Sequence, residues 1–267
     1  LSEENFLSSS RLISFLKLRA SYGVNGNDQI GNFAHLGLYG AAKFNNLSGL
    51  TATQLANPEL KWEKSVQTDI GLDFGLWNNR LSGEIDYYIR KTNDLLYNVP
   101  VPGTSGFATQ TVNIGSMENK GVEFVLNSTN IKSKNFSWNS SFNLARNSNK
   151  ITKLDGDQTI VPGNDGRYLN SLLVGESIGV FYGPRFAGAD PANGDALYFL
   201  PDGKTTTNDY DAAGNFVVGN PNPDWIGGLN NTVNYKGIEL SVLFQGVFGN
   251  QIQNGGGGFM SSSFDWF

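Results

Sequence analysis

The chain of 267 residues contains no cysteine, one histidine and little charge, and each shortage narrows what it can be. Without cysteine there is no disulfide framework and no thiolate zinc site. Because His35 is the only histidine, histidine-rich metal sites are excluded and most histidine-dependent catalysis is not expected here. Charged residues make up 16% of the chain, against roughly 25% in soluble domains, and the net charge is only −5. Nucleic-acid-binding proteins usually carry a basic patch, so nucleic acid is not expected as a partner.

Long apolar runs are also missing. No stretch approaches the roughly 20 apolar residues of a membrane helix, but strands that cross a membrane in a barrel give a much weaker signal. The chain opens with Leu1-Ser2-Glu3-Glu4-Asn5, so any export signal is expected to lie outside it.

What the chain does contain is a two-residue alternation. From Gln67 to Leu76 the even positions are mainly apolar and the odd positions are Gln, Asp and Gly. Successive strand side chains point to opposite faces, so such a strand has one apolar and one polar face. After Asn78-Asn79 the pattern resumes, and a two-residue turn that pairs Leu76 with Leu81 keeps both apolar faces on one side. The same arrangement is expected at Lys236-Gly237.

Seven long amphipathic strands are predicted, with links of alternating length. The strands are Leu12–Tyr22, Val66–Trp77, Arg80–Lys91, Glu118–Ser128, Phe136–Arg146, Trp225–Tyr235 and Ile238–Phe248. The links 23–65, 92–117 and 147–224 are long, and those between them are short. Strands that run up and down therefore place every long link at one end. This asymmetry is typical of outer-membrane barrels, which have long extracellular loops and short periplasmic turns.

Aromatic residues lie near the predicted strand ends. Trp77, Trp138 and Tyr235 are toward the short turns, and Tyr22, Tyr87 and Trp225 are toward the long links, as in two interfacial girdles. Alternation alone equally fits a β-sandwich core. The girdles and the loop asymmetry favour an all-β fold, a segment of an antiparallel up-and-down transmembrane β-barrel with long extracellular loops.

Seven strands do not make a complete bacterial single-chain barrel, which has an even number from about eight upward. Phe267 resembles a terminal barrel aromatic, but Gly255–Gly258 and Ser261–Ser263 do not form an alternating final strand. Residues 1–267 are therefore expected to be one partial barrel from a longer protein.

Several phrases of the chain resemble one family. They are Leu16–Asn27 (LKLRASYGVNGN), the stretch Asn57–Tyr97, Asn113–Leu126 (NIGSMENKGVEFVL), Gly175–Gly183 (GESIGVFYG) and Val218–Asn250. Together they resemble the C-terminal barrel region of the SusC/RagA-type TonB-dependent outer-membrane transporters of Bacteroidetes, in the same order and over nearly the whole chain.

The resemblance implies part of an active nutrient importer in the outer membrane, embedded in the lipid bilayer. Its implied partners are a SusD-like surface lipoprotein that forms a lid, TonB acting through parts absent here, and an oligosaccharide or peptide substrate. It implies no catalytic role, so no enzyme activity and no cofactor are expected. The alternative is a soluble or surface-attached β-sandwich that binds glycans.

Candidate substrate-binding residues lie in the link 147–224. Phe181, Tyr182 and Arg185 combine aromatic rings with a polar group, which suits sugar stacking but equally suits loop packing or contact with a lid. Polar strand positions are a second set that could line a substrate path or form an ordinary solvated wall, and these are Lys17, Arg19, Asp69, Asp73, Glu84, Asp86 and Arg90.

Two acidic clusters in the same link invite comparison with calcium loops. Asp209, Asp211 and Gly214 match the first, third and sixth positions, but Ala213 stands where Asp or Asn is wanted and Asn220 stands where Glu is wanted. For these residues and for Asp190–Asp195, Asx and glycine turns are the favoured interpretation. In Asn220–Trp225 the prolines are expected to fix the chain as it re-enters the barrel, and Trp225 to anchor it at the interface.

Overall fold

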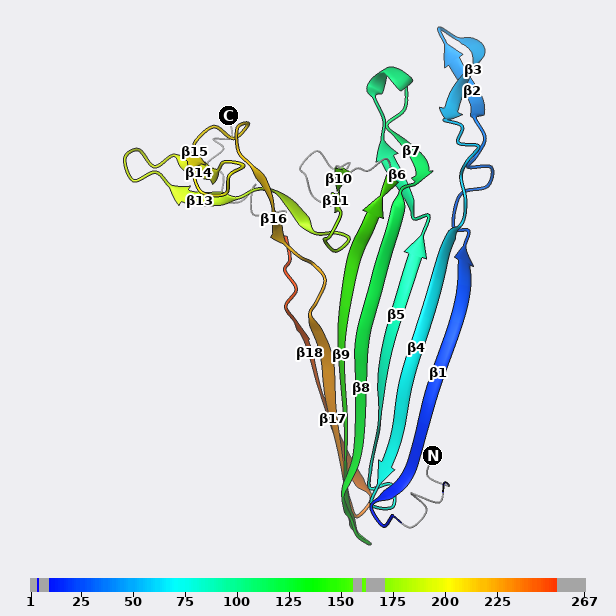
Figure 1. Ribbon diagram of the computed structural model, residues 1–267, viewed down its shortest axis with the longest axis vertical. Coiled ribbons are helices and arrows are strands. Elements are labelled where there is room, and N and C mark those ends of the chain that lie inside the picture. The colour runs from blue at the N-terminus through cyan, green and yellow to red at the C-terminus, as the bar shows by residue number, and fades with distance from the viewer. Residues whose placement is uncertain (1–3, 5–9, 156–159, 162–170, 254–267) are drawn as a thin grey trace.

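The computed structural model describes residues 4, 10–155, 160–161 and 171–253. Its main element is one antiparallel sheet with the strand order β1-β4-β5-β8-β9-β17-β18 (Figure 1). The seven strands are β1 (Ile13–Asn27), β4 (Glu63–Leu76), β5 (Leu81–Asn93), β8 (Gly115–Lys132), β9 (Phe136–Leu154), β17 (Trp225–Tyr235) and β18 (Ile238–Phe248). This order confirms the predicted up-and-down fold. The edge strands β1 and β18 do not pair with each other, so the barrel is not closed.

The strands are longer than the alternation predicts, mostly at the end with the long links. β1 continues to Asn27, β4 begins at Glu63 and β9 reaches Leu154, whereas β17 and β18 have the predicted bounds. Backbone pairing continues past the apolar alternation there, because a segment with two polar faces can still form ladder hydrogen bonds.

The short turns keep the predicted register. Leu76 pairs with Leu81 as predicted, and the N–H of Arg80 donates to Trp77 O at 3.2 Å across the turn Asn78-Asn79. Trp77, Asn78 and Asn79 have φ of 51°, 56° and 60°. Lys236 and Gly237 form a two-residue turn with φ of 48° and 89°, and Tyr235 pairs with Ile238 as predicted. Positive φ at both central residues is typical of the tight hairpin turn that matches strand twist.

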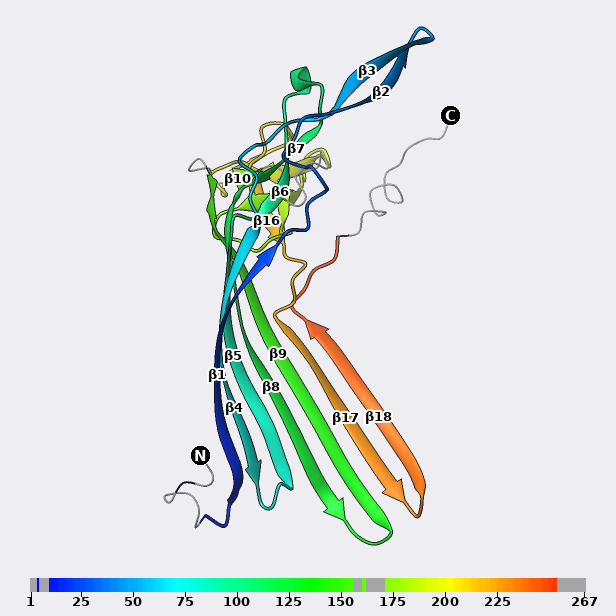
Figure 2. The same cartoon turned by 90° about the vertical axis from the view of Figure 1, so that its right-hand side faces the viewer.

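The long links carry short strands of their own, and all lie at one end of the sheet (Figures 1 and 2). The first link forms the hairpin β2 (Leu38–Phe44) and β3 (Leu47–Gln54), and the second forms β6 (Leu96–Pro100) and β7 (Thr109–Asn113) around the 3-10 turn η1 (Gly103–Ser105). The third contains β10 (Ile160–Val161), β11 (Leu172–Leu173), β12 (Phe181–Pro184), β13 (Phe186–Ala189), β14 (Ala196–Phe199), β15 (Thr206–Thr207) and β16 (Asn215–Gly219). The predicted asymmetry of the links is confirmed.

The two faces of the sheet differ as the alternation predicts. On one face, which we call the outer face, Leu18 is 61% and Ile70 53% exposed. The other, inner face carries the polar side chains. A two-layered sandwich would bury the apolar face under a second sheet, and no sheet within the described ranges covers it. The predicted girdle residues are exposed as well. Tyr22 and Trp225 lie toward the long links, and Trp77, Trp138 and Tyr235 lie toward the short turns, whereas Tyr87 lies at the middle of β5.

A small buried core lies at the long-link end. Ile114, Ile151, Leu154 and Leu172 form it, and Leu95, Tyr97, Val99 and Val112 pack against it. It joins the second and third links to the ends of β8 and β9.

No helix in the described ranges is long and apolar enough to cross a membrane. The predictions for Gly255–Phe267 fall outside the described residues.

Candidate functional site

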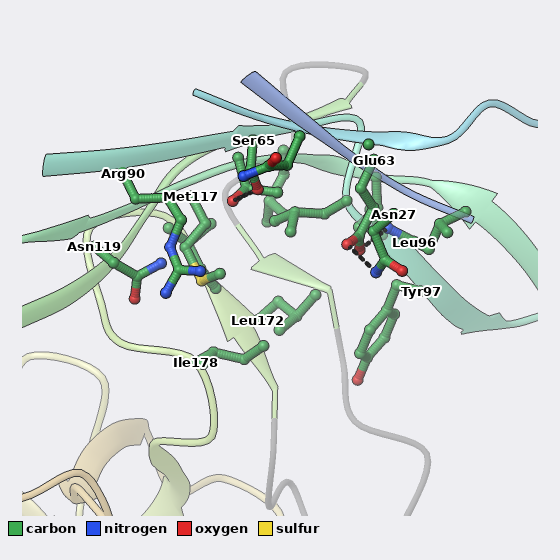
Figure 3. Close-up of a pocket in the computed structure, with 17 residues that line it drawn as sticks. Asn27, Glu63, Ser65, Arg90, Leu96, Tyr97, Met117, Asn119, Leu172 and Ile178 are labelled. Carbon is green, nitrogen blue, oxygen red and sulfur yellow. Dashed lines mark hydrogen bonds between the residues drawn. The ribbon is translucent and has the colours of Figure 1, made fainter. Parts of the chain in front are cut away.

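A cavity of about 590 Å³ opens on the inner face at the long-link end of the sheet. The ends of β1, β4, β5, β8 and β9 form one wall, and Leu172 and Ile178 of the third link lie opposite (Figure 3). Part of the lining is the buried apolar core, including Ile114 and Ile151. An apolar lining with a few polar groups is typical of small-molecule sites.

At one end of this cavity, the side chain of Glu63 forms hydrogen bonds that link three of the surrounding segments. Its Oε2 accepts a hydrogen bond from Nδ2 of Asn27 at 2.8 Å, and its Oε1 accepts one from the backbone N–H of Leu96 at 2.9 Å. The carboxylate therefore ties β1 and the start of β6 to β4. Figure 3 shows these residues beside Tyr97.

Arg90 lies at the other end of the cavity, beside Asn119 and Met117 (Figure 3). No carboxylate in the described ranges forms an ion pair with it. Its guanidinium group is therefore available to an anionic or hydrogen-bond-accepting group of a ligand.

The other inward arginine is neutralised. Arg19 lies 2.7 Å from Oδ1 of Asp73 and 2.9 Å from Oδ1 of Asp86, with Glu84 at 3.7 Å. In register, Arg19, Gly71 and Asp86 stand side by side on β1, β4 and β5. Because Gly71 has no side chain, the guanidinium crosses above β4 and links three strands.

A second cavity of about 440 Å³ extends the first along the inner face. Arg90 lines both, and Ser21, Asp69, Tyr88 and Glu123 line the second. The two cavities form a polar track from the long links toward the middle of the strands. This places Arg19, Asp69, Asp86 and Arg90, predicted as inward polar residues, along one path.

The predicted residues Phe181, Tyr182 and Arg185 lie elsewhere in the third link. Phe181 and Tyr182 belong to β12, which pairs with β16. The guanidinium carbon of Arg185 lies 4.3 Å from the ring centre of Phe199 and 4.6 Å from that of Phe216, and Nη2 donates to Gly203 O at 3.3 Å. These contacts hold the link together, and none of the three residues lines the 590 Å³ cavity. Their role in substrate binding stays a prediction.

The acidic clusters form the predicted Asx turns. Oδ1 of Asp190 accepts the N–H of Ala192 at 2.9 Å, and Oδ1 of Asp209 accepts that of Asp211 at 3.0 Å. Asp202 accepts hydrogen bonds from the N–H groups of Lys204 and Thr205 and from the Thr205 hydroxyl, which lowers the pKa of its carboxyl. Within the described ranges no group of three or more histidine or acidic side chains is arranged to hold a metal ion.

The segment from Asn220 to Trp225 joins the third link to β17. Nδ2 of Asn222 donates to Ile178 O at 2.9 Å, so this segment is tied to the chain beside the cavity. The guanidinium carbon of Arg146 lies 5.3 Å from the ring centre of Trp225 on the outer face. These contacts agree with the structural role expected for the segment.

The sequence analysis missed Glu63, Asn27 and Asn119. Glu63 and Asn27 lie beyond the ends of the predicted strands, and Asn119 lies at the start of the predicted strand Glu118–Ser128, where its neighbours Glu118 and Lys120 are also polar. Extending the two-residue period from Asp69 and Gln67 back to Glu63 would have placed Glu63 on the inner face.

Comparison with known proteins identifies the family. The family model described as "TonB dependent receptor-like, beta-barrel" matches residues 9–235. TonB-dependent receptor P3 of Formosa agariphila is 38% identical over 95% of this chain, and TonB-dependent receptor SusC of Bacteroides thetaiotaomicron is 34% identical over 94%. The structure of the RagAB peptide transporter superposes on 92% of this chain with a TM-score of 0.83 and 34% identity.

The chain spans only 28% of the first relative, 27% of SusC and 28% of the matched RagAB chain. The matched segments nevertheless cover nearly all of the seven-stranded sheet and its links. The chain therefore belongs to the SusC/RagA-type TonB-dependent receptors and forms part of their β-barrel.

Proposed function

We propose that this chain is part of the wall of an outer-membrane importer that takes up oligosaccharides or peptides. TonB supplies the energy, and a SusD-like surface lipoprotein closes the extracellular mouth. Membership of the TonB-dependent receptor family supports the general role, and the likeness to the RagAB peptide transporter supports peptides as one substrate class. The whole transporter's activity remains a proposal, because the chain covers a minority of its relatives' length.

The observation that carries the proposal is the polar track on the inner face. A cavity of about 590 Å³ at the mouth adjoins one of about 440 Å³ further along the strands, and Arg90 lines both. A substrate that enters among the long links would meet Arg90 before it meets the neutralised Arg19. Arg90 suits a peptide carboxylate or the hydroxyl groups of a sugar.

The first test is deletion of the gene in the source bacterium, with growth measured on single oligosaccharides and on peptide mixtures. Growth on at least one of these should be lost and restored by the full-length gene. The full-length protein should also fractionate with the outer membrane and co-purify with a lipoprotein. The importer would be refuted if the deletion strain grew normally on every substrate and the full-length protein were recovered in the soluble fraction without detergent.

The second test changes Arg90 in the full-length protein. Arg90→Gln should reduce uptake of the identified substrate several-fold, because a charge-assisted hydrogen bond is roughly twice as strong as a neutral one. Lys236→Gln is the control, since it removes one positive charge at a short turn far from the track. Equal uptake by the two variants would remove Arg90 from the substrate path.

A further inference from the structure

The outer face carries basic side chains at the long-link border of its apolar surface. Along each strand, the outward-facing residues can be followed from the short turns toward the long links. The first basic residue met on each strand is Arg146 on β9, Lys120 on β8, Lys91 on β5 and Lys64 on β4. All four are exposed. Lys150 lies two outward positions beyond Arg146 on β9, closer still to the long links.

These residues follow a regular diagonal across the sheet. Arg146 pairs with Val122, two residues from Lys120, and Lys120 pairs with Ile89, two residues from Lys91. Lys91 in turn pairs with Val66, two residues from Lys64. Each basic residue is thus two residues nearer the long links than the last.

The short turns are staggered in the same direction. Leu81, at the start of β5, pairs with Ser128, but β8 continues to Lys132 before its own turn. Strands of a barrel tilt against its axis, so positions at one height above a membrane shift along successive strands. The diagonal therefore corresponds to a band of roughly constant height rather than to scattered surface charge.

The band directly adjoins the apolar surface and its aromatic girdle. Below it on the same strands lie Ile70, Tyr87, Val122 and Leu144, and Arg146 stacks on Trp225 at 5.3 Å. Glu118 is the single acid among the outward positions of these four strands, all of them described. It lies 3.8 Å from Lys91 and 3.6 Å from Lys120, so it offsets only part of the positive charge.

We propose that Lys64, Lys91, Lys120 and Arg146 form a basic belt that binds the phosphate groups of anionic lipids in the extracellular leaflet. Clustered basic side chains at a membrane surface attract anionic headgroups, and lysine and arginine both bind phosphate. The ligand is inferred to be a lipid because the belt adjoins the apolar outer face, which would contact acyl chains, and because its positive charges complement negatively charged headgroups. The inference rests on the proposed membrane location of the chain.

The test is native mass spectrometry of the full-length protein in detergent, titrated with phosphorylated lipid A or with the same lipid after dephosphorylation. The triple variant Lys91→Gln, Lys120→Gln and Arg146→Gln should bind the phosphorylated lipid at least about tenfold more weakly than the native protein, and the dephosphorylated lipid equally. The control variant Lys43→Gln, Lys204→Gln and Lys236→Gln removes three charges elsewhere and should bind both lipids like the native protein.

A second variant keeps the test decisive if the triple variant folds poorly. Glu118→Gln removes the acid within the belt and should bind the phosphorylated lipid more tightly than the native protein. The proposal would be overturned if both the triple variant and Glu118→Gln bound the phosphorylated lipid like the native protein. It would also be overturned if the control variant lost as much affinity as the triple variant. Outer-membrane fractionation of the native protein is a separate readout, and its failure would overturn the proposed location itself.

Discussion

Among single residues, Gly71 illustrates how a missing side chain determines a contact. A Cβ at this position would clash with Oδ1 of Asp86 and lie 2.9 Å from the guanidinium carbon of Arg19. The ion pairs that join β1, β4 and β5 therefore depend on glycine in the central strand.

We predict that Gly71→Ala destabilises the full-length barrel by up to about 1 kcal/mol, because the ends of the Asp86 and Arg19 side chains must shift and their partly exposed ion pairs weaken. The change is measured by heating the protein in detergent and monitoring, by gel electrophoresis, the shift in mobility between the folded and the unfolded barrel. Gly23→Ala is the matched control, because a Cβ at Gly23 on β1 meets nothing within 4 Å. Equal melting temperatures for the two variants would contradict this role of Gly71.

Asp202 makes the turn 202–205 sensitive to acid. The Thr205 hydroxyl, together with the N–H groups of Lys204 and Thr205, lowers the pKa of its carboxyl below the ordinary 3.8. A carboxyl whose pKa is depressed on folding stabilises the fold above its unfolded pKa, and that stability is lost as pH falls through the folded pKa.

Hydrogen exchange at Lys204 and Thr205, corrected for intrinsic rates, should therefore show protection at neutral pH that is lost as the pH falls through the lowered pKa of Asp202. Asp202→Asn keeps an acceptor oxygen but cannot titrate, so its protection should not change over this range. The same pH dependence in both proteins would show that another group governs the turn.

Among the elements, the strands of the main sheet show how directly alternation reports an amphipathic surface. Leu72 lies mid-strand on β4, between Leu18 of β1 and Ile85 of β5 on the outer face. Leu72→Arg should destabilise the membrane-inserted barrel by about 2–4 kcal/mol, the range for arginine near the bilayer midplane.

The amount of full-length Leu72→Arg protein in the outer membrane, compared with Leu72→Met, measures this loss. Methionine conserves volume and polarity, so that variant should assemble normally. Normal assembly of the arginine variant would mean that this face does not contact lipid.

The elements also show where prediction from sequence stops. Leu72 and Ile85 could be placed because a half-buried strand alternates, and the register followed from Leu76 facing Leu81. The cavity could not be placed, because Asn119 has polar neighbours on both faces and because Leu172 and Ile178, which lie opposite the strands, belong to a long link that has no alternation. Arg185 was a reasonable ligand candidate by residue type, but its stacking on Phe199 and Phe216 depends on links whose short strands carry no alternation.

At the scale of the whole molecule, the seven strands make a sheet with two free edges and one apolar face. Free edges and an exposed apolar surface both promote association. We predict that the 267-residue chain, expressed alone, aggregates in aqueous buffer and is dispersed only by detergent.

Size-exclusion chromatography with and without detergent tests this prediction. A monomeric, cooperatively unfolding species in plain buffer would contradict it. That result would favour the soluble glycan-binding module, because it requires the apolar face to be covered within this chain.

The β2–β3 hairpin lies at the end of the molecule opposite the short turns, at the top of the view (Figure 1). Its tip is the two-residue turn Asn45-Asn46, with φ of 45° and 65°. Leu47 is exposed directly after this turn, and Leu50 and Tyr39 are exposed farther along the hairpin. In a barrel whose long links face outward, this tip would be the first part of the chain that an antibody, a bacteriophage or a host protease meets. An epitope tag inserted between Asn45 and Asn46 should be accessible on intact cells, whereas one inserted at Lys236-Gly237 should become accessible only after lysis.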